Sequence, residues 1–166
     1  MDPIKFKTHI GLLTHLSGMH YLYIPAEIIE KTGGKMVKRL ICVVNGKERW
    51  QCGFMALGEG AAYISISNQR MKKLHVQKGD LVDVILEEDI SKYGMEMPVE
   101  LEQVLLSDAE GEKRFELLTP GKKRYIIQYV NSVKNQDKRI ERALLLIGNL
   151  KQLPLGKEHF RDMLGK

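Results

Sequence analysis

The sequence predicts an α+β fold: a small closed antiparallel β-barrel of six to seven strands with short helical inserts, followed by a C-terminal bundle of three to four helices. Two observations lead to this prediction. Over roughly the first 90 residues, short alternating segments are separated by turn sequences, which is typical of small barrels, whose closure removes exposed strand edges. From residue 98 onward, apolar residues recur three and four positions apart, the spacing of amphipathic helices.

The first barrel elements follow from alternation and from proline chemistry. Residues 4–10 alternate between apolar and polar side chains and predict a strand with one face in solvent. A second strand is predicted at residues 20–24. Pro25 then begins a short helix over residues 26–31, because proline lacks only an N–H that the first helical turn leaves unpaired in any case.

The Asn45-Gly46 pair is the clearest hairpin signal in the chain, since both residues accept the positive φ angles of a two-residue turn. It joins predicted strands at residues 37–44 and 47–56. The remaining predicted elements are a turn at 58–60, a strand at 61–66, a helix at 68–74 and, after the turn Lys78-Gly79-Asp80, a strand at 81–87.

Four helices are predicted in the second half of the chain. They span residues 99–106, residues 109–118, a segment that begins after the N-cap pair Thr119-Pro120, and a segment that ends before Pro154. Their spacing predicts one buried face on each of three helices. The candidate buried residues are Val99, Leu101 and Leu105; then Tyr125, Ile126, Tyr129, Val130 and Val133; and then Ile140, Ala143, Leu144, Ile147 and Leu150.

The change of pattern near residue 92 predicts where the domains begin and end. Residues 1–92 form the predicted barrel domain, residues 93–152 the helical segment, and residues 153–166 a tail whose last ten residues are expected to be loosely held. Tyr93-Gly94 lies in the predicted linker.

Short motifs in both halves resemble a known bacterial domain combination. Residues 21–25 (Tyr-Leu-Tyr-Ile-Pro), the Asn45-Gly46 hairpin and the Lys78-Gly79-Asp80 turn resemble a small β-barrel family of unknown function. That family is often joined to a helical segment of the YdeI/OmpD-associated type. The second half of this chain is similar to that segment in the stretches 98–106, 115–118, 123–125, 133–134 and 139–140. The resemblance covers about residues 4–150 and implies the fold but no activity, since a fold does not determine a function.

Composition predicts a folded protein of the cytoplasm. Of the 166 residues, 43% are hydrophobic and 28% are charged, which is the balance of a globular domain. No apolar run approaches the ~20 residues that span a bilayer, and the N-terminus lacks a signal-peptide layout, so we expect no membrane association. Cys42 and Cys52 are expected to be reduced and to act as small apolar residues, although neighbouring strands of one hairpin leave a disulfide open.

Catalytic motifs are missing, so the sequence leans against an enzyme and predicts no catalytic residue, no metal and no cofactor. The five histidines show no metal-ligand spacing with carboxylates that complete a site. No serine lies in a Gly-x-Ser-x-Gly elbow, and Gly58 and Gly60 are not followed by the third glycine of a dinucleotide loop.

The leading functional hypothesis is a non-catalytic binding protein whose basic helical face meets an anionic partner. The formal net charge is +5, and an acidic stretch that ends at residue 112 is followed by a basic one. The predicted site consists of Arg124, Lys134, Lys138, Arg139 and Arg142. The alternative explanation is an ordinary solvated face, or packing of the acidic stretch against the basic one.

Two further hypotheses place the function in the barrel. A small-molecule or enzymatic site at the barrel mouth would be lined by Tyr21, Tyr23, Trp50 and Tyr63. Cross-strand aromatic packing explains the same residues. The other hypothesis is a nucleic-acid-binding barrel like those of transcription regulators, in which the helical basic residues Lys134, Lys138, Arg139 and Arg142 would follow the phosphates.

Overall fold

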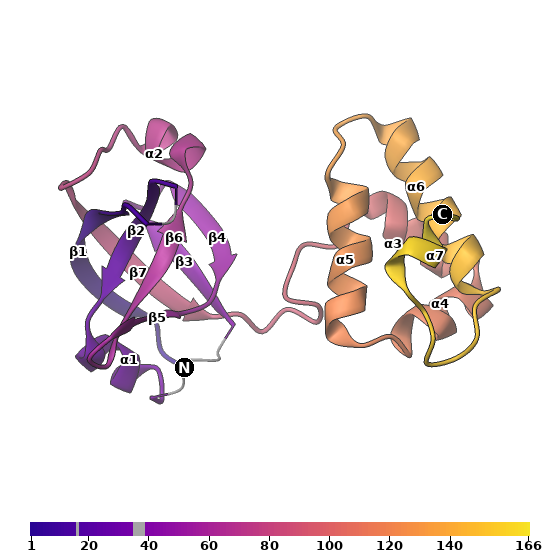
Figure 1. Ribbon diagram of the computed structural model, residues 1–166, viewed down its shortest axis with the longest axis horizontal. Coiled ribbons are helices and arrows are strands. Elements are labelled where there is room, and N and C mark those ends of the chain that lie inside the picture. The colour runs from indigo at the N-terminus through magenta and orange to yellow at the C-terminus, as the bar shows by residue number, and fades with distance from the viewer. Residues whose placement is uncertain (16, 35–38) are drawn as a thin grey trace. The chain divides into compact units, whose positions relative to one another are not determined.

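A computed structural model describes residues 1–15, 17–34 and 39–166. The chain divides into two compact units, Met1–Ile90 and Ser91–Lys166, which we call the sheet unit and the helical unit (Figure 1). Each unit is described by itself.

In its described residues, the sheet unit contains seven strands and two short helices, close to the predicted set. The strands are β1 (Ile4–Leu13), β2 (Met19–Ile24), β3 (Leu40–Val44), β4 (Glu48–Cys52), β5 (Met55–Gly58), β6 (Ala61–Ile66) and β7 (Leu81–Glu88). The helices are α1 (Ala26–Lys31) and α2 (Asn68–Leu74). The predicted strand at 37–44 starts in residues 37 and 38, which lie outside the described residues.

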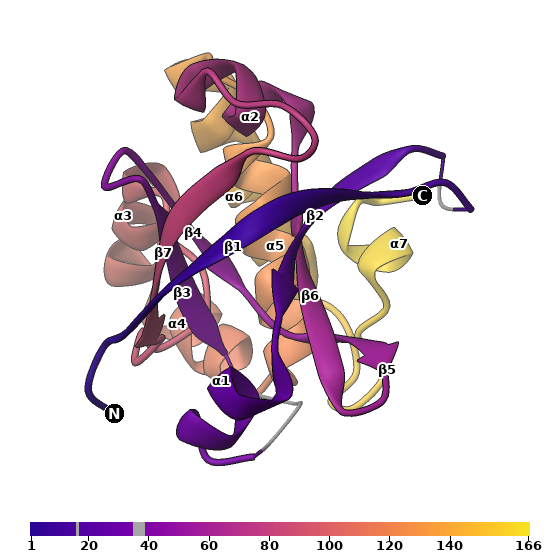
Figure 2. The ribbon, with the colours of Figure 1, turned by 90° about the vertical axis from the view of Figure 1, so that its left-hand side faces the viewer.

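The sheet is open, which corrects the predicted closed barrel. Its strand order is β4-β3-β7-β1-β2-β6-β5, so β4 and β5 are the two edges of an antiparallel half-barrel. Figure 2 shows β1 crossing between its two neighbours; its first half pairs with β7 and its second half with β2. The single strand predicted at 47–56 is broken at residues 53–54, because there the chain passes from one edge to the other. This link of three residue steps holds the ends of the edges within about 10 Å of each other.

Alternation along the strands places the core of the sheet unit on one face. Leu22, Ile64 and Leu86 are fully or almost fully buried on this face. Phe54, in the link between the two edge strands, packs into the same core. Residue 8 is the polar exception among the buried strand positions, and its hydroxyl is satisfied: Thr8 Oγ1 donates to the carbonyl of Tyr23 at 2.6 Å.

The helical unit consists of five helices around a second core. They are α3 (Val99–Ser107), α4 (Ala109–Glu116), α5 (Pro120–Asn131), α6 (Gln136–Leu150) and α7 (Phe160–Met163). Side-chain oxygens of Asp108, Thr119 and Asn135 cap α4, α5 and α6 by accepting backbone N–H groups, as N-cap residues do. The largest fully buried side chain is Phe115, which packs with Ile126, Ile127 and Leu146.

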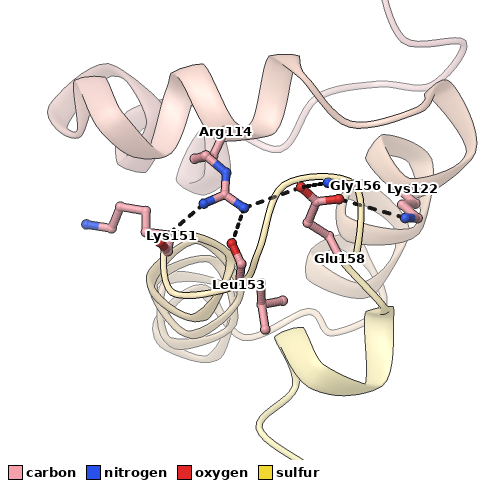
Figure 3. Close-up of polar contacts among 6 residues, drawn as sticks. All are labelled: Arg114, Lys122, Lys151, Leu153, Gly156 and Glu158. Atoms are coloured by element: carbon pink, nitrogen blue, oxygen red, sulfur yellow. Dashed lines mark hydrogen bonds and ion pairs between the residues drawn. The ribbon is translucent and has the colours of Figure 1, made fainter.

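Residues 153–166, the predicted tail, fold back onto the helical unit through a buried ion pair (Figure 3). The Arg114 guanidinium lies 3.3 Å from the Glu158 carboxylate, and the two side chains are 14% and 7% exposed. Arg114 also donates to the carbonyls of Lys151 and Leu153, which follow α6. Met163, on α7, is completely buried. The chain after α6 is therefore held at both its start and its end.

A second polar cluster ties the segment before α3 to the rest of the helical unit. The Tyr93 hydroxyl donates to Glu116 at 2.6 Å, and the ammonium groups of Lys92 and Lys123 lie 3.0 and 3.3 Å from the same carboxylate. Burial acts against the charge of Glu116, but these three hydrogen bonds outweigh it and lower the pKa of Glu116 to about 2.

This cluster makes the stability of the helical unit depend on acidity. Because the folded-state pKa lies below the ordinary value of 4.5, the contribution of Glu116 is present above that pH and is lost as the pH falls toward 2. We expect Glu116→Gln to cost about 1 kcal/mol at neutral pH, after allowance for solvent screening, and almost nothing at pH 2.5. Urea unfolding at several pH values measures the difference. Glu112→Gln, an exposed acid on the same helix, should show no such pH dependence; an equal dependence would contradict the assignment.

Candidate functional site

A cleft of about 400 Å³ lies in the helical unit, between α3 and α6. Its size is that of a small-molecule site, and its surface is mainly apolar. The lining residues are Val99, Glu100, Gln103, Val104, Ser107, Asp108, Gln136, Ile140 and Leu144.

Each wall of the cleft is a stripe of residues on one helix. Residues 99, 103 and 107 are four apart along α3, with 100 and 104 beside them, and residues 136, 140 and 144 are four apart along α6. Pro98 precedes α3 and Asn135 caps α6, so each stripe begins in the first turn of its helix. The two stripes face each other because the helices pack together below them, where Leu101 and Ile147 are fully buried.

Three apolar side chains of the cleft are exposed, although the helices that carry them also contribute to the core. Val99 is 65%, Leu144 56% and Ile140 37% exposed, while Val104 below them is buried. All three exposed residues were predicted to be buried, and the structure corrects this. Leu146 takes the predicted place of Leu144 in the core and is fully buried. The apolar side of α6 is thus wider than the part that the other helices cover.

Glu100 is the charged group in the first turn of the α3 wall. Its side chain is 11% exposed, and Oε2 is buried without a hydrogen bond. The nearest cation is Arg139, whose Nη1 lies 3.9 Å from Oε2, beyond hydrogen-bond distance. Arg139 is held in place by its Nε, which donates to the carbonyl of Val133 at 2.6 Å. The Glu100 carboxylate is therefore only partly compensated.

The far end of the cleft is occupied by groups that already have partners. Asp108 accepts from the Lys151 ammonium at 2.7 Å and from the backbone N–H of Gly111 at 2.9 Å. These two hydrogen bonds lower the pKa of Asp108. The hydroxyl of Ser107 donates to the carbonyl of Gln103 at 2.8 Å, so it is not poised as a nucleophile.

This arrangement of side chains in the cleft suits the binding of a small molecule. The walls are apolar, one carboxylate is incompletely paired, and the side-chain amides can donate or accept hydrogen bonds. Within the described ranges, no group of three or more His, Cys, Asp and Glu side chains could hold a metal ion.

The predicted basic site is partly gathered around the connection between α5 and α6. Lys134 and Lys138 are exposed there, and Arg142 lies over the Tyr129 ring at 4.2 Å. Arg142 also donates to the carbonyl of Tyr129 and to the Ser132 hydroxyl, so it joins the end of α5 to α6. Arg124 lies seven residues before the last residue of α5, about 10 Å along the helix axis.

The four residues proposed for the barrel mouth do not share one face of the sheet. Trp50 pairs with Cys42 on the core face, and Arg70 lies over its ring at 4.8 Å. Tyr21 and Tyr23 alternate with the buried residues of β2 and lie on the opposite face, where Tyr63, the strand partner of Tyr23, is itself only 8% exposed. Tyr21 and Tyr63 pack edge to face there, with ring centroids 5.6 Å apart.

The two cysteines lie on the core face of β3 and β4 as free thiols. Residue 52 is two positions beyond Trp50, the strand partner of Cys42, so the thiols are diagonal neighbours. A hydrogen bond with Cys52 and burial both raise the pKa of Cys42. This keeps the Cys42 thiol protonated and unreactive.

None of the helices in the described part of the chain is long and apolar enough to cross a membrane. The fold and the cleft define a two-unit α+β protein with a site of small-molecule size in its helical unit.

Comparison with protein families finds one match in each unit. Residues 6–86 match the family described as "Domain of unknown function (DUF1905)", and residues 94–152 match the family described as "Bacteriocin-protection, YdeI or OmpD-Associated". The chain thus matches a family of unknown function over its first part and the YdeI/OmpD-associated family over its second, which confirms the resemblance stated from the sequence. A search of curated proteins found no match. All residues that line the cleft fall within the second matched range.

Proposed function

We propose that the protein is a binding protein without catalytic function, and that its helical unit takes a small amphipathic organic molecule in the cleft between α3 and α6. The observation that carries this proposal is the exposure of Val99, Ile140 and Leu144 around one cavity. Covering a large aliphatic side chain contributes about 1.5–3 kcal/mol when burial is complete. A ligand that fills the cleft would gain part of this free energy from each of the three exposed side chains.

The dimensions of the cleft favour a small molecule over a macromolecule. A volume of about 400 Å³ lies within the usual range of ligand sites. The lining is mainly apolar and includes a few polar side chains, which can fix the orientation of a ligand. The basic site weighs less in this proposal, because Arg139 and Arg142 already donate to backbone carbonyls. An anionic partner at Lys134 and Lys138 stays a prediction, as do nucleic-acid binding and a ligand at Trp50.

The proposal is tested with n-octanol as an apolar probe and the methyl groups of the full chain as reporters. We expect the NMR signals of Val99, Ile140 and Leu144 to shift and saturate, with a Kd on the order of 1 mM for so small a ligand. Leu81 and Leu117 are exposed leucines away from the cleft and should not move.

A variant separates specific binding from general adsorption. Leu144→Gln replaces the apolar end of the side chain by an amide, and we expect it to weaken octanol binding severalfold. Leu117→Gln, the matched control, should leave the affinity unchanged. Equal shifts at all exposed leucines, or no saturable shift at Ile140 and Leu144, would show that the cleft binds no such ligand.

A further inference from the structure

We infer that the ligand of this cleft carries a cationic nitrogen bound by the carboxylate of Glu100. This inference rests on the proposed function and names the chemical class of its ligand: an amine with an aliphatic body.

The first support is the state of Glu100 itself. A buried carboxylate oxygen without a hydrogen bond is costly, and native proteins rarely leave one unpaired. The Arg139 guanidinium does not remove this cost, since it stays 3.9 Å away while its Nε donates to the backbone of residue 133. Oε2 itself is closed to solvent, so a ligand ammonium would approach the exposed part of the Glu100 side chain that lines the cleft. A rotation of the carboxylate would then let the ammonium donate the missing hydrogen bond and add the charge-assisted strength of an ion pair.

The second support is the charge of the surroundings. Two of the nine lining residues are carboxylates and none of the nine is a lysine, arginine or histidine. Asp108 already receives hydrogen bonds from Lys151 and Gly111, so Glu100 is the acid with capacity to spare. The remaining polar groups are the amides of Gln103 and Gln136 and a hydroxyl, which can accept further N–H groups. The cleft is therefore complementary to a donor-rich cation.

The third support is the position of the carboxylate relative to the apolar walls. Val99 adjoins Glu100 in sequence, and Val104 lies one turn along the same helix. Ile140 is the neighbour of Arg139 on the facing wall. The aliphatic chain of a ligand whose ammonium binds Glu100 would thus lie between the apolar side chains of the two walls. An aliphatic amine therefore fits both the carboxylate and the apolar surface of the cleft.

A matched series of three ligands with the same chain length tests the inference: n-octylammonium, n-octanol and octanoate at neutral pH. We expect octylammonium to bind about tenfold more tightly than octanol, the usual gain of a hydrogen bond to a charged group, and octanoate to bind more weakly than octanol. The shifts of Ile140 and Leu144 again report binding. The preference would oppose the net charge of +5, which by itself attracts octanoate.

A substitution assigns the preference to one residue. Glu100→Gln should bring the affinity for octylammonium down to that for octanol, while octanol binding stays within about twofold. Glu102→Gln removes an exposed carboxylate from the same helix that does not line the cleft, and it should preserve the tenfold preference.

The outcomes separate the two proposals. Octanol binding with no preference for octylammonium overturns the role of Glu100 and leaves the binding function standing. A preference that survives Glu100→Gln also overturns it. Failure of all three ligands to shift Ile140 and Leu144 overturns the binding function itself. If Glu100→Gln does not fold, the comparison of the three ligands on the natural chain still decides.

Discussion

Replacing Arg114 by methionine is expected to destabilise the helical unit by about 3 kcal/mol, the largest effect of any single change considered. The substitution preserves most of the aliphatic volume but leaves Glu158, whose side chain is 7% exposed, without its closest cation. It also removes the donors that satisfy the carbonyls of Lys151 and Leu153 at the end of α6. Glu158 would keep only the Lys122 ammonium, 4.0 Å away, and the backbone N–H of Gly156. A buried charge that loses its main partner costs far more than a surface ion pair gains.

The two separate cores give this experiment an internal reference. Trp50 is the single tryptophan and packs against the core of the sheet unit, so its fluorescence follows that unit. Far-UV circular dichroism at 222 nm follows mainly the helical unit, which holds the longer helices. We expect urea to unfold the Arg114→Met variant earlier at 222 nm, with little change in the Trp50 transition. Arg161→Met, an exposed arginine on α7, is the control, and a loss below about 1 kcal/mol in Arg114→Met would contradict the prediction.

The second large effect is expected at Gly111, where α4 lies directly against Ile147 of α6. A Cβ atom there would lie 2.5 Å from Cγ2 of Ile147 and 2.8 Å from Oδ2 of Asp108. Ile147 is fully buried and cannot move aside, so Gly111→Ala should push the helices apart and cost about 2 kcal/mol.

A glycine-to-alanine substitution elsewhere in the helical unit should instead stabilise it. Gly148 lies within α6, and a Cβ atom there would meet nothing within 4 Å. Alanine is the better helix former, so Gly148→Ala should stabilise the unit by about 0.5–1 kcal/mol. Unfolding in urea measures both variants. Equal effects from the two substitutions would mean that helix propensity, and not the close approach of α4 to α6, decides the outcome.

Local signals in the sequence predicted most of the elements but not how the sheet ends. The bounds of α1, β6 and α2 match the prediction, because turn residues, caps and alternation all act within a few positions. Whether seven strands close depends on the pairing of β4 with β5, which are separated by only two residues. The alternating pattern continues through the break at 53–54, so the pattern by itself does not distinguish one long strand from two edges.

The cleft was missed for a related reason. Spacing of three and four residues identifies the apolar side of a helix, but it does not say how much of that side a neighbour covers. One signal was present in the run Leu144-Leu145-Leu146, because three consecutive residues spread over about 200° of a helix and cannot all face one core. The basic site was predicted from charge alone. Charge does not show that Arg142 would bind the backbone carbonyl of residue 129 near the end of α5.

The two edges of the sheet have a consequence for encounters between copies of the protein. An edge strand offers unpaired N–H and C=O groups on which a strand of another molecule can add, the first step toward aggregation. Here β5 is only four residues long, with a register shift between Ala56 and Gly58 that interrupts its hydrogen-bonding pattern. The other edge, β4, alternates the polar side chains of Arg49 and Gln51 with Trp50, and Arg49 pairs with Glu87 on β7. Both edges are thus poor templates for a further strand, so the sheet can remain open without inviting intermolecular stacking.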